Sequence, residues 1–199
     1  LMSAGVPLAE TTTTGMLVWL FKELQIPASY SVGSTLNFGP SGKFDPNSRY
    51  FIYECDEYDR NFLHFTPWAS IVTAVDYDHP NIFTSVADYK QAFLQFLSQS
   101  GHIYLWQKDA QYLSSQPLAT ALANINSTTH RITEVPDSSD LSDIRLAGEH
   151  TRRNGLLAAL LVADGYGDEA AAMRPSIHAA LASFPGTDRR FEKLADNLY

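Results

Sequence analysis

The stretch Tyr50–Cys55 (YFIYEC) decides the fold class of this chain. Apolar and aromatic residues occupy both of its alternating faces, a pattern that favours a strand. A strand that is apolar on both faces belongs to a sheet covered on both sides, as parallel sheets are. Two further runs of the same kind follow at 70–75 (SIVTAV) and His102–Trp106 (HIYLW).

Segments with helical spacing of apolar residues alternate with these strands. Four such segments are predicted as helices, the last interrupted by Pro175: 11–24, 85–97, 151–163 and 168–184. Weaker patterns predict strands at 29–32 and 127–135 and a loop or hairpin at 37–48, and leave 110–122 undecided. The alternation predicts an α/β fold, with a mostly parallel central sheet flanked by helices on both faces and one domain over residues 1–199.

Composition narrows the class of protein. The chain has 199 residues, 45% of them hydrophobic, which suffices for a sizeable core. Its net charge of −8 excludes a basic surface that coats nucleic acid. The longest apolar run, residues 16–21, is far shorter than the roughly 20 residues of a membrane span. With one cysteine and no secretory signal pattern, we expect a cytoplasmic protein without membrane insertion or disulfides.

Acidic residues and a histidine follow two of the predicted strands, where ligands bind in parallel sheets. Residues 54–59 (ECDEYD) place four carboxylates in six positions, which indicates either a cation site or a solvated turn with Asp59 capping the next helix. Asp78 and His79 follow the second strand and could ligate a metal, relay a proton or form a structural turn. Cys55 lies inside a strand with no histidine nearby, which favours a buried, inert thiol.

Small residues lead into the first predicted helix, and two Arg-Arg pairs occur late in the chain. A phosphate-binding loop needs glycines and a lysine, but the corresponding positions are Ala9 and Glu10. By pattern alone, residues 4–14 therefore form a capped helix start rather than such a loop. The Arg-Arg pairs, at 152–153 and 189–190, are candidate phosphate contacts or solvated surface charge.

Taken in order, five motifs resemble those of the central, ATP-binding domain of the Mur ligases of peptidoglycan synthesis. Residues 11–14 (TTTT) resemble the threonines after the family's G-T-H-G-K loop, and 54–64 (ECDEYDRNFLH) resemble E-A-D-E-S-D…F-L-H. Residues 71–79 resemble I-V-T-N…D-H, 148–154 resemble G-x-H-N-x-x-N, and 184–191 resemble F-x-G-T-x-R-R-F. The resemblance covers nearly the whole chain, and its second and fifth motifs favour the L-alanine-adding type.

The resemblance implies a reaction and a set of roles. ATP phosphorylates the carboxylate of UDP-N-acetylmuramate, and an amino acid then attacks the acyl phosphate to give an amide, with Mg²⁺ assisting. It also implies that Thr11, Glu54 and His79 bind metal, with Glu57 as the alternative carboxylate. The nucleotide contacts that it implies are Thr11, Thr12, His150 and Asn154. Arg190 would lie near the phosphates, and His79 and Arg190 would serve catalysis.

Departures from the family pattern shape the functional hypotheses. Glu10 replaces the loop lysine, and Val6 and Ala9 replace loop glycines, so the resemblance predicts a degenerate phosphate loop. The first hypothesis is an excised central domain, without the family's N-terminal UDP-binding and C-terminal domains and inactive alone. The alternative is a non-catalytic binding or scaffolding module that no longer binds ATP. A third is an unrelated α/β enzyme that uses Glu54 and His79 as metal ligands without a nucleotide.

Overall fold

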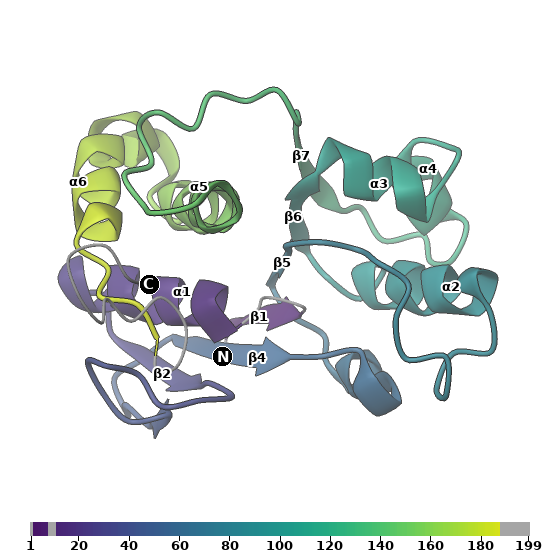
Figure 1. Ribbon diagram of the computed structural model, residues 1–199, viewed down its shortest axis with the longest axis horizontal. Helices are drawn as coiled ribbons and strands as arrows, with labels where there is room; N and C mark the ends of the chain where they lie inside the picture. Colours follow the sequence, from purple (N-terminus) through teal and green to yellow (C-terminus); the bar gives the residue numbers. More distant parts are fainter. Residues whose placement is uncertain (1, 8–10, 188–199) are drawn as a thin grey trace. The chain divides into compact units, whose positions relative to one another are not determined.

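The computed structural model describes residues 2–7 and 11–187, which form two compact units (Figure 1). Among these residues, the first unit holds 11–54 and 140–187, and the second holds 2–7 and 55–139. Each unit combines parallel strands with helices, so the predicted α/β class is confirmed.

Strand β4 (Tyr50–Cys55), which carries the residues that decide the fold, organises the first unit. It pairs in parallel with β2 (Ala28–Ser31), whose other edge pairs antiparallel with β3 (Gly42–Lys43). The predicted strand at 50–55 is confirmed with the same bounds, and the hairpin predicted at 37–48 contains β3.

Helix α1 (Thr11–Glu23) packs against β2 and against two later helices, α5 (Glu149–Asp164) and α6 (Ala170–Ala182). Both helices lie above α1 in the view of Figure 1. Because it is covered by strands and helices, α1 is buried along most of its length. The indole N–H of Trp19 donates to the carbonyl of Ala180 at 2.8 Å and so ties α1 to α6. Gln25 ends the helix with a φ of 57°, the left-handed cap that often precedes a proline.

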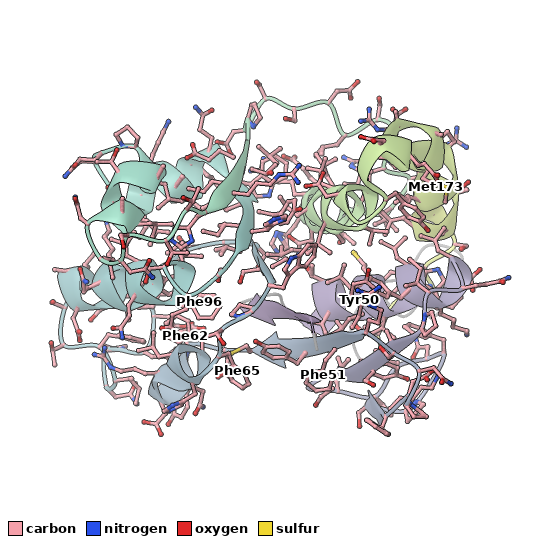
Figure 2. The ribbon with its side chains drawn as sticks, turned by 180° about the vertical axis from the view of Figure 1, so that it is seen from behind. Tyr50, Phe51, Phe62, Phe65, Phe96 and Met173 are labelled. Carbon is pink, nitrogen blue, oxygen red and sulfur yellow. The ribbon has the colours of Figure 1, made fainter. Side chains whose placement is uncertain are left out.

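The second unit is built on a parallel sheet in the order β1 (Met2–Pro7), β5 (Ala69–Val72), β6 (His102–Trp106) and β7 (Arg131–Val135). The short helices η1 (Tyr58–His64), α2 (Val86–Leu97), α3 (Gln107–Leu113) and α4 (Leu118–Ala123) pack beside it. Ser85 caps α2 by accepting from the amide of Asp88 at 3.1 Å. Phe62 and Phe96 stack with their ring centroids 5.3 Å apart and form part of the core (Figure 2).

Several predicted elements differ from the observed ones in their ends. The strand predicted at 70–75 stops at Val72, since the amide of Val75 bonds to the Asp109 carboxylate at 3.1 Å instead of to a strand. The strand predicted at 127–135 begins only at Arg131, after a turn in which Asn126 accepts from Thr128. The helix predicted at 168–184 begins with the 3₁₀ turn η2 (Gly167–Glu169), and α6 continues through Pro175.

The role suggested for Asp59 as a helix cap is wrong, because Asp59 lies inside η1 with a φ of 53°. The undecided segment at 110–122 contributes to two short helices, α3 and α4. None of the helices within the described ranges is long and apolar enough to cross a membrane.

Candidate functional site

The carboxylate of Glu54 joins two distant parts of the first unit. Its Oε1 accepts from the hydroxyl of Thr11 at 3.0 Å, and its Oε2 accepts from the amide of Gly33 at 2.8 Å. Thr11 begins α1, whereas Glu54 lies near the end of β4 and Gly33 just beyond β2. Two residues that the sequence places 43 positions apart are thus brought together as oxygen donors.

Gly33 makes this arrangement possible because it has no side chain. A Cβ at this position would lie 2.9 Å from Oε2 of Glu54, which is shorter than the non-bonded contacts that Cβ atoms make in proteins. The sequence reasoning missed Gly33, although the glycine directly after a predicted strand is a signal that could have drawn attention to it.

Buried threonines follow Thr11 in the first turn of α1. The hydroxyls of Thr12, Thr13 and Thr14 are buried, and none has a hydrogen-bond partner among the described residues. A buried hydroxyl left unpaired costs about 1–3 kcal/mol. Ala9 and Glu10, on which the prediction of a degenerate loop depends, lie outside the described residues.

His79 forms the centre of a second cluster, in the second unit. Its Nε2 lies 3.7 Å from Oε1 of Glu57 and 3.9 Å from a carboxylate oxygen of Asp78. The ring of Tyr58 packs edge-on against the imidazole, with centroids 5.4 Å apart. His79 has a φ of 55°, and its amide donates to Asp78 at 2.6 Å. The structure therefore pairs His79 with Glu57, the carboxylate that the sequence reasoning held as an alternative to Glu54.

Burial changes the acidity of two groups beside this cluster. Burial raises the pKa of Glu57, and the neighbouring His79 opposes that increase. Burial, followed by the charges of Asp56 and Glu57, raises the pKa of the Cys55 thiol to about 12. The prediction that Cys55 is buried is confirmed. A thiol with a raised pKa is protonated at neutral pH, which favours the interpretation of Cys55 as inert.

Helix α5 carries two of the predicted nucleotide contacts, His150 and Asn154. It begins after Gly148, whose φ of 80° is accessible mainly to glycine. His150 in the first turn is exposed, whereas Asn154 is only 1% exposed. Both amide atoms of Asn154 are buried, and within residues 2–7 and 11–187 they have no hydrogen-bond partner. A fully buried amide with two open hydrogen-bonding positions fits a polar ligand that offers both a donor and an acceptor.

The last described residues belong to the motif at 184–191. Thr187 is fully buried and pairs with Leu36, and its Cγ2 would lie 2.6 Å from a Cβ on Gly15. The absence of a side chain at Gly15 therefore lets this segment dock against α1. Arg190, the predicted phosphate contact, lies outside the described residues, as do Arg189 and Phe191.

Asp109, which the sequence reasoning did not single out, fixes the segment that leads to His79. It is 4% exposed, and its Oδ1 accepts from the amide of Val75, while Oδ2 has no partner in the part of the chain that the structure describes. Burial raises the pKa of Asp109 to about 6. The available signal was an acidic residue three positions after the predicted strand at 102–106.

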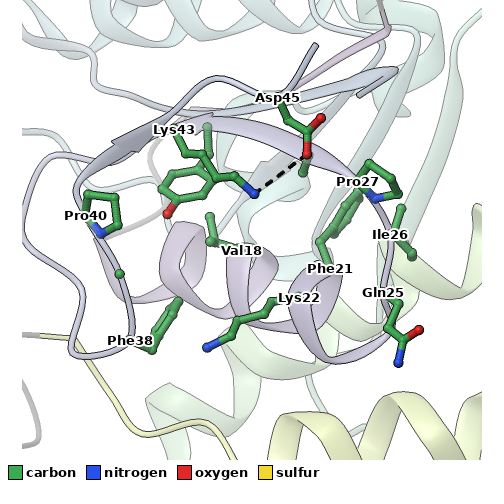
Figure 3. A pocket seen from close by; sticks show the side chains of 13 residues that line it. Val18, Phe21, Lys22, Gln25, Ile26, Pro27, Phe38, Pro40, Lys43 and Asp45 are labelled. Atoms are coloured by element: carbon green, nitrogen blue, oxygen red, sulfur yellow. Dashed lines mark ion pairs between the residues drawn. The ribbon is translucent and has the colours of Figure 1, made fainter. Parts of the chain in front are cut away.

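Two pockets lie among the described residues of the first unit, and neither is lined by the predicted residues Thr11, Glu54 or Asn154. One pocket of about 430 Å³ lies between α1 and the β2–β3 hairpin, with Phe21, Phe38 and Tyr30 among its walls and Lys22 and Lys43 near its opening (Figure 3). Neither this pocket nor a second one beside α6 includes Thr11, Glu54 or Asn154. Within the ranges that the structure describes, no three His, Cys, Asp or Glu side chains are grouped closely enough to hold a metal by themselves.

Comparison with known proteins gives the class of this fold. The structure is similar to UDP-N-acetylmuramate–alanine ligase from Thermotoga maritima, with a TM-score of 0.71 and 20% identity over 96% of this chain and 46% of that one. It is also similar to UDP-N-acetylmuramate:L-alanyl-gamma-D-glutamyl-meso-diaminopimelate ligase from Neisseria meningitides, with a TM-score of 0.68 and 19% identity over 92% of this chain and 66% of that one. The fold is therefore that of the Mur ligases.

Sequence similarity identifies the family. The chain is 33% identical to UDP-N-acetylmuramate–L-alanine ligase from Levilactobacillus brevis over 94% of its length, and 30% identical to the same enzyme from Salinispora arenicola over 95%. No family model matches the chain. The chain belongs to the Mur ligase family, and among its relatives are ligases that join L-alanine to UDP-N-acetylmuramate. It spans less than half of their length, 44% and 41% respectively.

Proposed function

We propose that residues 1–199 form the central domain of a ligase that adds L-alanine to UDP-N-acetylmuramate in the synthesis of peptidoglycan precursors. The observation that carries this proposal is the contact of Thr11 with Glu54, because both residues lie at the metal positions of the family motifs. In such an enzyme ATP and Mg²⁺ supply the phosphoryl group that activates the carboxylate for attack by the amine.

The chemistry of the donors supports a magnesium site. Mg²⁺ prefers oxygen ligands and is usually held by one or two carboxylates together with water and phosphate oxygens. The hydroxyl of Thr11 and the carboxylate of Glu54 are such donors, 3.0 Å apart. A site that needs phosphate oxygens to complete it also agrees with the absence of a full protein ligand set among the described residues. We propose Thr11 and Glu54 as its ligands. His79 lies in the second unit, where it stays a predicted metal ligand beside Glu57.

The buried amide of Asn154 supports a nucleotide contact. Its open donor and acceptor match the edge of adenine, which offers one of each. We propose that Asn154, with His150 beside it, binds the base, that Thr12 contacts the phosphates, and that Arg190 stabilises charge on the transferring phosphoryl group. Guanidinium groups are suited to that role because they present several donors in a fixed plane.

The phosphate loop sets the affinity of this chain for nucleotide. In the proposal, Glu10 repels the phosphates where the family has a lysine, and Val6 and Ala9 stand where the family has glycines that let backbone amides surround the phosphates. The chain as written should therefore bind Mg-ATP weakly and have no ligase activity by itself.

Calorimetric titration with Mg-ATP tests this proposal. The triple variant Val6→Gly, Ala9→Gly, Glu10→Lys should bind Mg-ATP measurably and the unchanged chain much more weakly. Tight binding by the unchanged chain would show that the interpretation of the loop is wrong. If the triple variant is folded and binds no more nucleotide than the unchanged chain, the ATP-binding role is wrong as well.

A second candidate is a Mur-like binding or scaffolding module that no longer uses ATP. The observation that favours it is that both carboxylate oxygens of Glu54 already accept hydrogen bonds from the chain itself. The natural gene separates the two candidates: a G-T-H-G-K loop at this position in the full-length sequence would exclude the second.

A further inference from the structure

A pocket of about 430 Å³ lies between the segment that precedes α5 and the outer face of α6, entirely within the first unit. Arg174 and His178 are four residues apart on α6 and therefore project from the same face of that helix. Arg145 and Asp143 approach from the preceding segment, while Pro175 and Ala179 form an apolar wall. Its volume lies within the range of about 300–1,000 Å³ that is typical of small-molecule sites.

The charge of this pocket is positive in a chain of net charge −8. Arg145 and Arg174 both line it, and within the described part of the chain the guanidinium group of neither has an ion pair or a hydrogen bond. Asp143 is the one carboxylate among the lining residues. Guanidinium groups that face a common space without partners fit a ligand with two negative charges on oxygen atoms, because each can donate two parallel hydrogen bonds.

Packing behind the pocket holds its two sides in place. A Cβ on Gly155 of α5 would lie 2.9 Å from Leu146, 3.1 Å from Leu181 of α6 and 3.2 Å from Ile144. The bare backbone at Gly155 thus lets the segment around Ile144 and the inner face of α6 pack onto the same point of α5. Because Ile144 and Leu181 are buried there, the positions from which Arg145 and Arg174 project are set by the core.

We propose that this pocket binds a small dianionic ligand, with a phosphate or dicarboxylate group held by Arg145 and Arg174 and an apolar part against Pro175 and Ala179. This site is separate from the proposed ATP site, because it includes none of Thr11, Glu54 or Asn154. It also differs from the Arg-Arg pairs at 152–153 and 189–190 that the sequence indicated as phosphate contacts.

Titration of the chain with inorganic phosphate, and separately with succinate, tests the proposal and distinguishes the two ligand classes. Binding is followed by the imidazole C–H signals in NMR, with the signal of His178 identified by its loss in His178→Gln. We expect saturable binding of at least one probe that shifts the His178 signal. Arg145→Gln and Arg174→Gln should each weaken it roughly tenfold, as expected for the loss of a charge-assisted pair of hydrogen bonds.

Arg49→Gln is the matched control, since Arg49 is an exposed arginine of the same unit that does not line the pocket. It removes the same charge and should change the affinity less than twofold. Equal weakening by all three arginine variants would mean that the probes sense net charge alone, which overturns the proposal. Binding that is lost in Thr11→Ala but unchanged in the pocket variants would assign the anion to the proposed ATP site and equally overturn it, whereas the ATP proposal would stand.

Discussion

Glu54 shows how one carboxylate can serve both folding and chemistry. Its hydrogen bond with Thr11 joins the start of α1 to the end of β4, and its hydrogen bond with Gly33 holds the segment that follows β2. A carboxylate used in this way carries two hydrogen bonds of its own and still presents further lone pairs to a cation. Its charge, rather than its shape, is what a metal would require.

The substitution Glu54→Gln separates these two roles. The amide retains an oxygen acceptor of the same shape, so folding should change little, but the loss of negative charge should weaken Mn²⁺ binding, used as a probe for Mg²⁺, by roughly tenfold or more. Isothermal titration in the presence of nucleotide measures the effect, with Glu23→Gln, an exposed carboxylate at the end of α1, as the control. Unchanged affinity in both Glu54→Gln and His79→Ala would exclude these residues as ligands.

Asp109 makes the stability of the protein depend on pH. Its pKa is raised to about 6 by burial, against about 3.9 for an aspartate in an unfolded chain. Between these two values the folded state binds more protons than the unfolded state. The contribution of Asp109 to the free energy of unfolding is therefore fully present below pH 4. As the pH rises through 6, this contribution, about 2–3 kcal/mol, is lost.

The variant Asp109→Asn should lack this loss. Its side-chain oxygen still accepts from the amide of Val75, but it carries no charge at any pH. We expect the free energy of unfolding, measured with urea at pH 4 and pH 7, to fall less in this variant than in the unchanged chain. Asp168→Asn, at an exposed position, should behave like the unchanged chain. If the free energy of unfolding depends on pH identically in Asp109→Asn and the unchanged chain, the claim that burial raises the pKa of Asp109 is wrong.

At the scale of elements, the close approach of the segment around Thr187 to α1 depends on Gly15. Alanine favours a helix interior over glycine by about 1 kcal/mol, so Gly15→Ala would stabilise a helix in isolation. Here the new Cβ would meet Cγ2 of Thr187 at 2.6 Å. We expect Gly15→Ala to lower the free energy of unfolding by about 1–2 kcal/mol, because overpacking in a buried position forces neighbouring atoms to move.

Thr187→Ser provides the matched test, since it removes that methyl group and keeps the hydroxyl. In the double variant Gly15→Ala, Thr187→Ser the clash is gone, and the loss of stability should be smaller than the sum of the two single losses. Additive losses in a double-mutant cycle, measured by chemical unfolding, would mean that the two residues do not meet.

Elements with a strong two-sided or helical pattern were predictable from the sequence, and their ends were less so. The runs that became β4 and β6 are apolar on both faces and were predicted with their observed bounds. The end of β5 could not be read in this way, because Val75 is apolar like a strand residue but bonds to Asp109, 34 positions away. Local pattern carries no information about such a partner.

At the scale of the whole molecule, motif order predicted the family, while the grouping of side chains needed the structure. The family resemblance implied Thr11, Glu54 and His79 as metal ligands, with Glu57 as the alternative carboxylate. The structure describes two local groups instead, Thr11 with Glu54 in the first unit and Glu57 with His79 in the second. A glycine after a predicted strand could have drawn attention to position 33, but only the structure shows the Glu54 carboxylate that lies against it.

The central claim of this account is that Thr11 and Glu54 form the magnesium end of a nucleotide site. Its most direct test is the Mg-ATP affinity of the Val6→Gly, Ala9→Gly, Glu10→Lys variant, measured by calorimetry with a further change at Thr11. Thr11→Ser keeps the hydroxyl and should preserve binding within about threefold, whereas the isosteric Thr11→Val should weaken it at least tenfold in the presence of Mg²⁺ and little in its absence. Equal affinities for the serine and valine variants in the presence of Mg²⁺ would contradict the claim.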